Sequence, residues 1–267
     1  MSDGDEYVTL RERFDEDAVR YDRARPRYPV ELFDDLAAAG VTAGAGVLEI
    51  GCGTGQATVS LAERGCRIVA VELGADLAAL ARRNLARFDA VEVVTAAFEG
   101  WALPAEPFDV VFAATAFHWI DPAVRVSKSA DAVRLGGLLA TVGTHHIAGG
   151  SWDEAFFDAI QECYSRFDPS TPAGLRLQRA RDIVEDDREL VSSGRFGAAT
   201  FSRYEWEQSY STAEYLDLLL TYSGHRALPD EQRSALLDAI ARLIDVELGG
   251  RIVKRYLTEL RVARRVR

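Results

Sequence analysis

The chain has 267 residues, of which 48% are hydrophobic and 27% charged, and its formal net charge at pH 7 is −11. This length allows one large α/β domain or a domain with a small appendage. A nucleic-acid-binding protein usually carries a basic face that neutralises phosphates, so the acidic balance argues against that class.

The cysteines and the N-terminus favour a cytoplasmic protein. Cys52, Cys66 and Cys163 make a poor disulfide framework and suit a reducing compartment. The first six residues are acidic, whereas a signal peptide starts with a basic segment. No apolar run approaches the roughly 20 residues of a membrane helix. We expect no nucleic-acid or membrane partner, and the oligomeric state stays open. Only Lys128 and Lys254 are lysines among the basic residues, and we attach no function to that.

The N-terminal segment is expected to form short helices. Phe14, Ala18 and Tyr21 recur at helical spacing on one face. The Arg-Pro-Arg-Tyr-Pro sequence of residues 25–29 interrupts any helix, because proline lacks a backbone donor and restricts the residue before it. A second helix is expected over 30–39.

From residue 46 onward, short apolar strands alternate with helices. This alternation is typical of βαβ units, which build a parallel sheet covered by helices on both faces. The crossovers should be right-handed. Strands are expected over 46–50, 67–72, 91–94, 108–113 and 137–142, and helices over 56–64, 75–88 and 122–134.

After residue 144 the alternation stops. We interpret 145–197 as an insertion and 198–264 as the part that completes the sheet. Ser211 or Thr212 is expected to cap the helix that follows it. Helices are expected over 151–166, 180–190, 212–221 and 229–248, and strands over 200–208 and 251–264.

The most informative segment is the loop from Glu49 to Gly55. Its glycines, Gly51, Gly53 and Gly55, lie between a strand and a helix, where backbone can approach a ligand and the helix presents free N–H groups. A dinucleotide-binding fingerprint places its third glycine three residues after the second, whereas here the distance is two. The spacing therefore disfavours an NAD-dependent oxidoreductase. The alternative is a tight turn that binds no ligand.

The pattern Glu-x-Gly-x-Gly-x-Gly over 49–55 resembles motif I of the class I S-adenosylmethionine-dependent methyltransferases. The Phe-His-Trp sequence after the fourth strand and the 134–137 turn extend this resemblance to about residues 30–150. It implies an α/β, Rossmann-like seven-stranded sheet, mostly parallel, in the order 3-2-1-4-5-7-6. Strand seven should be antiparallel, helices should cover both faces, and a helical cap should be present. The implied cofactor is S-adenosylmethionine, with S-adenosylhomocysteine as product.

The resemblance also implies a division of the chain and a set of cofactor contacts. The segments are a helical lid over 1–40, a cofactor-binding core over 41–147, a helical insertion or cap over 148–197 and a C-terminal completion of the sheet over 198–267. In motif I the expected contacts are Glu49, Gly51, Cys52, Gly53, Thr54 and Gly55.

Beyond motif I, Glu72 is implied to accept hydrogen bonds from both ribose hydroxyls, because a carboxylate offers two acceptor oxygens. Leu73 would lie against the adenine. Ala97 stands where the family often has an adenine-binding Asp, so Phe98, Glu99 or backbone N–H groups would have to recognise the base. Ala114 is expected to lie beneath the methionine part of the cofactor, and Thr115 and Trp119 are further expected cofactor contacts.

The segment from Tyr21 to Pro29 resembles a lid that covers the cofactor in these enzymes. Tyr21 and Arg25 would then contact the methionine carboxylate, since arginine offers a bidentate fork. The alternative is a surface segment held in place by its tyrosines.

His118 is the candidate general base, and the competing interpretation is a histidine packed into the pocket wall beside Trp119. His145 and His146 could touch substrate. A metal site is not expected, because no further ligands accompany this pair. Several aromatic residues are interpreted as core first and as an acceptor-pocket wall second: Trp152, Phe156, Phe157, Tyr210, Tyr215 and Tyr222.

These observations predict a methyltransferase that acts on a small-molecule acceptor, a metabolite or an intermediate of natural-product biosynthesis. One alternative is a non-catalytic or regulatory S-adenosylmethionine-binding protein, which the alanine at position 97 favours. Another is an aminopropyltransferase-like enzyme, but that family needs further acids near the fourth strand, and 113–117 offers none.

Overall fold

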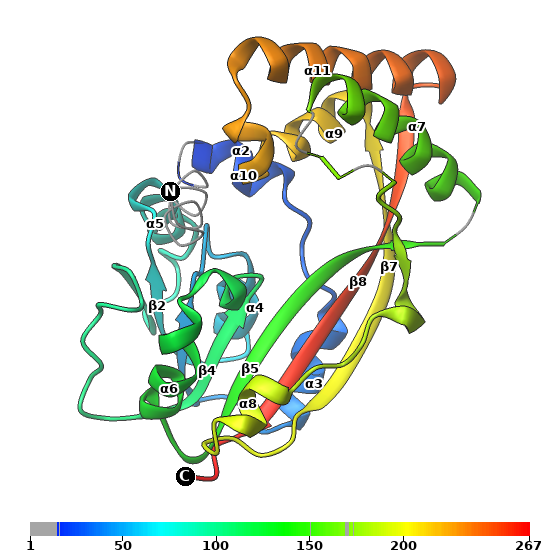
Figure 1. Cartoon of the computed structure of the whole chain (residues 1–267). Helices are drawn as coiled ribbons and strands as arrows, with labels where there is room; N and C mark the ends of the chain where they lie inside the picture. Colours follow the sequence, from blue (N-terminus) through cyan, green and yellow to red (C-terminus); the bar gives the residue numbers. More distant parts are fainter. Residues whose placement is uncertain (1–14, 16, 150, 169–170, 173) are drawn as a thin grey trace. The chain divides into compact units, whose positions relative to one another are not determined.

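The computed structural model describes residues 15, 17–149, 151–168, 171–172 and 174–267, with the side chains of 151–154 left aside; Phe14 and the rest of 1–14 lie outside this part. The chain folds into two compact units. Figure 1 draws the elements of the whole chain, coloured along the sequence. The first unit comprises the described residues of 1–26, 145–184 and 205–257. The second comprises 27–144, 185–204 and 258–267.

The strands form an eight-stranded sheet in the order β3-β2-β1-β4-β5-β8-β7, with the short β6 paired to β5. Leaving β6 aside, this is the predicted order, and the eighth strand is the one difference. The bounds are β1 Gly46–Ile50, β2 Arg67–Glu72, β3 Val91–Thr95, β4 Phe108–Ala114, β5 Val133–Ala148, β6 Gln178–Arg179, β7 Thr200–Ser211 and β8 Arg251–Arg264.

The strands β1 to β5 are parallel to one another. The last strand, β8, runs antiparallel to β5. The Gly136 N–H donates to the carbonyl of Arg265, the Arg265 N–H donates to the carbonyl of Gly137, and further along the pair the Arg261 side chain donates to the Thr141 hydroxyl. This direction was expected. Strands β5, β7 and β8 each contribute residues to both units.

Alternation along the strands fills two cores of the second unit, as a sheet with both faces covered requires. On β1, Val47 belongs to one cluster and Leu48 to the other, and Val110 and Val111 of β4 divide in the same way. The first cluster includes residues of α3 Val30–Ala38, α4 Gln56–Glu63 and α5 Ala75–Asn84, and the second includes residues of α6 Pro122–Ala132 and α8 Arg188–Ser192.

Strand β5 starts earlier than predicted and is irregular at its start. Its pairing with β4 jumps from Phe108–Val133 to Val110–Leu138, so the Arg-Leu-Gly-Gly turn loops out between them. A Cβ atom on Gly137 would lie 2.6 Å from the carbonyl oxygen of Asp109, which explains why glycine occupies that position.

The first unit packs helices around a third core. Helices α7 and α11 lie side by side (Figure 1), and their buried residues join those of α9 and β8. Ser211 caps α9, and a full capping box with Glu214 confirms the expected helix start. The helices are α2 Ala18–Ala24, α7 Ser151–Phe167, α9 Thr212–Leu219, α10 Ser223–Ala227 and α11 Asp230–Arg242, with a π-helical turn over Leu243–Glu247.

The prediction of a helix over 180–190 is wrong. The structure has a 3₁₀ turn over Ala180–Asp182, and α8 starts only at Arg188. The Asp186 carboxylate accepts the backbone N–H of Arg188 at 3.0 Å, and Asp187 accepts that of Ala199 at 2.9 Å. The local bond from Asp186 competes with helix formation, and the bond from Asp187, which spans twelve residues, ties the segment before α8 to the segment before β7.

Candidate functional site

The glycine loop after β1 approaches the loop after β4 very closely. Gly51 has a φ of +68°, and its N–H donates to the carbonyl of Val71 at 2.8 Å. A Cβ atom there would lie 2.5 Å from Cβ of Ala116. Gly53 and Gly55 also have positive φ, at 57° and 89°. The backbone path of this loop therefore requires glycine at position 51 on two independent grounds.

The rest of the loop is held from neighbouring elements. Thr54 is buried, and its carbonyl accepts the Asn84 side-chain amide at 2.9 Å. The Gly55 N–H donates to the carbonyl of Cys52 at 2.9 Å, and Gly55 is the N-cap of α4. The loop thus leads directly into the N-terminus of α4, as the sequence predicted.

Glu72 ends β2 with a carboxylate that faces two backbone donors. Its Oε2 accepts the Gly53 N–H at 2.7 Å, and its Oε1 accepts the Gly74 N–H at 2.9 Å. The side chain is buried, while Leu73 beside it is half-buried. Because each carboxylate oxygen can accept a further hydrogen bond, this arrangement orients Glu72 without exhausting it.

Glu49 is a carboxylate inside the core. It is 1% exposed, and its Oε2 has no hydrogen-bond partner among the described residues. Burial raises the pKa of Glu49 to about 7, and the charge of Glu72 adds to the rise while the Thr58 hydroxyl opposes it. Burial also raises the pKa of the Cys52 thiol well above its usual value, helped by the same two carboxylates, so Cys52 is not a thiolate nucleophile.

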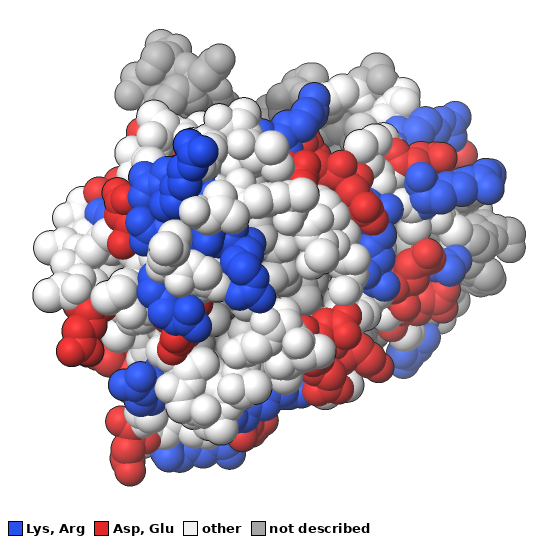
Figure 2. All heavy atoms as spheres, turned by 90° about the horizontal axis from the view of Figure 1, so that it is seen from below, with Lys and Arg blue, Asp and Glu red and all other residues white. Residues whose placement is uncertain are grey.

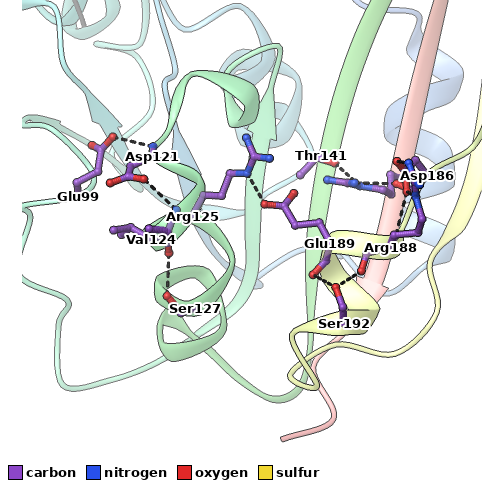
Figure 3. Close-up of polar contacts among 12 residues, drawn as sticks. Glu99, Asp121, Val124, Arg125, Ser127, Thr141, Asp186, Arg188, Glu189 and Ser192 are labelled. Atoms are coloured by element: carbon purple, nitrogen blue, oxygen red, sulfur yellow. Dashed lines mark hydrogen bonds and ion pairs between the residues drawn. The ribbon is translucent and has the colours of Figure 1, made fainter. Parts of the chain in front are cut away.

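The loop after β3 brings no acid to the position of Ala97. Phe98 is buried in the second core cluster, with the Lys128 ammonium 5.2 Å from its ring centroid. The Glu99 carboxylate accepts the backbone N–H of Asp121 at 3.3 Å. Glu99 is therefore oriented toward the start of α6, as Figure 3 shows.

The end of β4 carries a strained residue. Thr115 has a φ of +52°, which is rare for a β-branched side chain and typical of functional sites. Its N–H donates to the carbonyl of Val142 at 2.8 Å, and a 2.8 Å hydrogen bond joins its hydroxyl to that of Tyr28. Ala114, just before it, is buried. These contacts hold an unfavourable backbone conformation at the expected methionine end of the cofactor.

His118 and Trp119 belong to a 3₁₀ turn, Phe117–Trp119, that is anchored by Phe117. The Phe117 ring is buried and meets two guanidinium groups, those of Arg125 and Arg261, at 5.5 and 5.8 Å. Arg125 donates to Glu189 at 2.6 Å, as Figure 3 shows. Arg261 donates to the Thr141 hydroxyl at 3.1 Å and to the carbonyl of Asp186 at 2.9 Å.

The His118 side chain itself is exposed, with its ring 5.1 Å from that of Trp119. The second unit thus brings together the predicted residues of the glycine loop, Glu72, Leu73 and the loops after β3 and β4 at the carboxyl ends of the parallel strands. In open α/β sheets that edge is where ligands bind.

Comparison with known proteins shows which family this ligand-binding edge is similar to. Residues 47–137 match the model of a methyltransferase domain family. An uncharacterized methyltransferase of Mycobacterium tuberculosis is 29% identical over 228 residues, which cover 84% of this chain and 82% of the relative. A solved structure assigned as a Type II methyltransferase, from Anaeromyxobacter dehalogenans, has a TM-score of 0.60 at 26% identity and covers 90% of this chain and 97% of its own.

The family match, the methyltransferase relatives and the solved structures together support a class I S-adenosylmethionine-dependent methyltransferase. A further relative, trans-aconitate 2-methyltransferase of Azoarcus sp., is 36% identical over 110 residues, which cover 40% of this chain and 42% of that protein.

The site of this methyltransferase fits its cofactor, S-adenosylmethionine. The cofactor carries a sulfonium and an ammonium, and the second unit offers two buried carboxylates, Glu49 and Glu72, one of them with an oxygen that has no partner in the described residues. Gly51 has no side chain at the point where the loop after β1 comes closest to the loop after β4. Among the residues that the structure describes, no three His, Cys, Asp or Glu side chains gather as metal ligands would.

Tyr21 and Arg25 lie in the first unit. Arg25 donates to the carbonyl of Thr221 at 2.9 Å, and its guanidinium lies 5.0 Å from the ring centroid of Tyr21 and 4.6 Å from that of Tyr222. Helix α2 is joined to α9 through Arg23, which pairs with Asp217 at 2.6 Å. Their predicted contact with the methionine carboxylate stays a prediction.

The first unit also contains a cavity of about 450 Å³. Four of the predicted pocket aromatics line it, and Tyr210 is instead buried with its hydroxyl 2.9 Å from that of Tyr256. Trp152 lies outside the described side chains. The cavity is also lined by polar residues that the sequence did not single out as a group: His146, Tyr164, Asp168, His225 and Lys254.

Sequence reasoning named His146 as a possible substrate contact and missed the other four residues, because they come from distant segments. Lys254 and His146 are 108 residues apart, yet Nζ of the lysine lies 3.2 Å from Nδ1 of the histidine. The one signal was compositional, since Lys254 is one of only two lysines in a chain rich in arginine. In the same way, nothing in the sequence marked Arg125 and Arg261 as the supports of Phe117.

Gly51→Ala is expected to destabilise the protein by about 2 to 5 kcal/mol, because it adds a clash to a left-handed backbone. Urea unfolding measures this loss. Adding Ala116→Gly should recover the part due to the clash and leave about 1 to 2 kcal/mol for the backbone. Gly100→Ala is the control, since a Cβ atom there meets nothing within 4 Å. Equal stability of the Gly51→Ala and Gly100→Ala variants would contradict this account.

Glu49→Gln is expected to flatten the dependence of stability on pH. The folded-state pKa is about 7 against an ordinary 4.5, so the protonated carboxyl favours the folded state below pH 4.5, and this contribution is lost as pH rises through 7. The full effect is about 3 kcal/mol. Unfolding in urea between pH 4.5 and 8 checks it, with Glu92→Gln, an exposed acid on β3, as control. Wild-type and Glu49→Gln curves that run parallel would show that Glu49 does not titrate in this range.

Proposed function

We propose that this methyltransferase transfers the methyl group of S-adenosylmethionine to a small-molecule acceptor, a metabolite or a natural-product intermediate. The observation that carries the proposal is the cavity of the first unit. Its volume of about 450 Å³ lies within the range of about 300–1,000 Å³ that is typical of small-molecule sites. A macromolecular acceptor would require an open surface instead.

Charge supports the same class of acceptor. The net charge is −11, and on the face drawn in Figure 2 acidic side chains lie close to most groups of basic ones. Nucleic acids are usually bound by a continuous basic track. The Azoarcus relative is named for a small organic acid as acceptor, which also favours a small molecule. Within the described ranges, no helix is long and apolar enough to cross a membrane.

The residues of the second unit take separate roles in this proposal. Glu72 accepts the ribose hydroxyls, and Leu73, Ala97 and Phe98 surround the adenine. The methionine end meets the glycine loop together with Ala114, Thr115 and Trp119. Tyr21 and Arg25 of the first unit are the proposed contacts of its carboxylate. When bound, S-adenosylmethionine supplies a methyl group already activated by the sulfonium.

The chemistry left to the protein is alignment, exclusion of water and removal of a proton where the acceptor must lose one. His118 is the proposed base. Its 3₁₀ turn is held through Phe117 between Arg125 and Arg261, so the imidazole is presented from an anchored segment rather than from a free loop. Its exposure leaves the ring accessible to an acceptor.

Calorimetry with S-adenosylmethionine tests the cofactor site. Glu72→Gln and Arg25→Ala should each weaken binding about 10- to 100-fold, the value of one or two charge-assisted hydrogen bonds. Glu92→Gln and Arg23→Ala are matched controls. Glu92 is an exposed acid on β3, and Arg23 is a second arginine near Tyr21, on α2, where it pairs with Asp217 of α9. An unchanged affinity in Arg25→Ala would remove the lid role, and a wild-type protein that does not bind the cofactor would refute the function.

Formation of S-adenosylhomocysteine with a panel of small acids, phenols and amines tests the reaction. In His118→Ala, kcat should fall about 100-fold with little change in KM, as loss of a general base predicts. A raised KM with full kcat would instead identify His118 as pocket wall. Cofactor binding without turnover on any small acceptor would indicate a non-catalytic protein.

A further inference from the structure

The cavity of the first unit has walls suited to a ring. Phe156 and Tyr215 are buried, with their ring centroids 5.4 Å apart and nearly perpendicular. Ile160 and Leu219 are buried beside them and also line the cavity. Aromatic and aliphatic walls of this kind gain most of their binding energy from the apolar body of a ligand. The walls therefore select a compact, largely apolar molecule.

Polar groups gather at one part of this lining. The Nε2 atom of His146 lies 3.3 Å from the Tyr222 hydroxyl, and its Nδ1 lies 3.2 Å from Nζ of Lys254. The ammonium also lies 5.4 Å from the ring centroid of Tyr215 and 5.8 Å from that of Tyr256. One cation and two hydrogen-bonding groups thus meet beside an otherwise apolar wall.

The electrostatic field at this place comes from basic groups. Burial lowers the pKa of His146 well below its usual value, and Lys254, Arg25 and His145 lower it further. His146 is consequently a neutral imidazole at neutral pH, able to donate or accept a hydrogen bond. The charged groups that act on His146 are basic, so a negative group of a ligand placed beside this imidazole would meet favourable charge.

Other polar groups of the lining are engaged with one another or with groups outside it. The hydroxyl of Tyr164 lies 2.8 Å from Nε2 of His225, whose pKa falls to about 4 because of burial. The Asp168 carboxylate, the one acid among the described residues of the lining, accepts the Thr171 hydroxyl at 3.0 Å. Arg255 also lines the cavity, and its guanidinium pairs with Glu205 at 3.0 Å. The cation that lies beside His146 and the aromatic wall is therefore Lys254, which we assign as the anchor of an anionic group.

We propose that this cavity binds the methyl acceptor, and that the acceptor is a compact ring-containing molecule with one acidic oxygen group, a carboxylate or a phenolate, held by Lys254, His146 and Tyr222. Only the statement that this ligand is the methyl acceptor rests on the proposed function; the chemistry of the ligand is inferred from the cavity itself. The acidic group anchors the molecule, and the methylated atom belongs to another part of it or to the same group.

The test is calorimetry with matched probes, 1-naphthoate and its neutral analogue 1-naphthamide, on the full chain saturated with S-adenosylhomocysteine. We expect naphthoate to bind at least about tenfold more tightly than naphthamide. Lys254→Met keeps the aliphatic stem and removes the charge, so it should weaken naphthoate binding about 10- to 100-fold and leave naphthamide almost unchanged. Arg251→Met is the control, because it removes an exposed charge from the same strand outside the cavity lining.

A second variant keeps the result independent of folding effects at Lys254. Gly224 lines the cavity, and a Cβ atom there meets nothing within 4 Å, so Gly224→Leu should fold and weaken both probes about tenfold or more. Equal affinity for the two probes, a preference that survives in Lys254→Met, or no binding of naphthoate would overturn the proposal. Failure to bind S-adenosylhomocysteine would refute the methyltransferase function separately, since the probe comparison can be repeated without it.

Discussion

The arrangement of the second unit depends on the close approach of Gly51 to Ala116. Each residue follows a strand, β1 and β4, and these are neighbours in the sheet at the point where the strand order reverses. At such a point consecutive crossovers leave in opposite directions and open a crevice, which is where open α/β sheets bind ligands. A Cβ atom on Gly51 would lie 2.5 Å from that of Ala116, so the two loops can meet only with these small residues. This contact fixes the start of the glycine loop. The loop then passes Glu72, which accepts the Gly53 N–H, and enters α4 at Gly55.

Most of the fold could be predicted from the sequence. Its two signals, the alternation of strands with helices and the family motifs, can each be recognised within short segments. Apolar strands alternating with helices predicted the parallel sheet, and the resemblance supplied its order. Where local chemistry competes, prediction failed. Over 180–190 the composition resembles a helix, but Asp186 and Asp187 bind backbone N–H groups of their own surroundings and delay the helix to Arg188. The early start of β5 depends on a looped-out turn that only pairing with β4 reveals.

The candidate site divides in the same way. Its glycines and Glu72 stand at fixed spacing and could be recognised, whereas its supports come from distant segments. The Phe117 ring lies near both Arg125 and Arg261, which are more than half of the chain apart in sequence. These contacts depend on how the 3₁₀ turn, α6 and β8 pack against one another. The strain at Thr115 is likewise invisible in sequence, because threonine is an unfavourable choice for a left-handed backbone.

Charge separates the roles of the two units more sharply than the net value suggests. The cofactor is a cation, and the second unit contains two buried acidic side chains, Glu49 and Glu72, at the proposed cofactor site. The cavity of the first unit has the opposite character, since the described residues that line it include two cations, Lys254 and Arg255, and one acid, Asp168. In a protein of net charge −11 this lining therefore carries an excess of one positive charge beside apolar walls, where low polarity strengthens its effect. Under the proposed function, the acidic acceptor would be disfavoured near the carboxylates and favoured near Lys254, so electrostatics alone would assign each reactant to its own site.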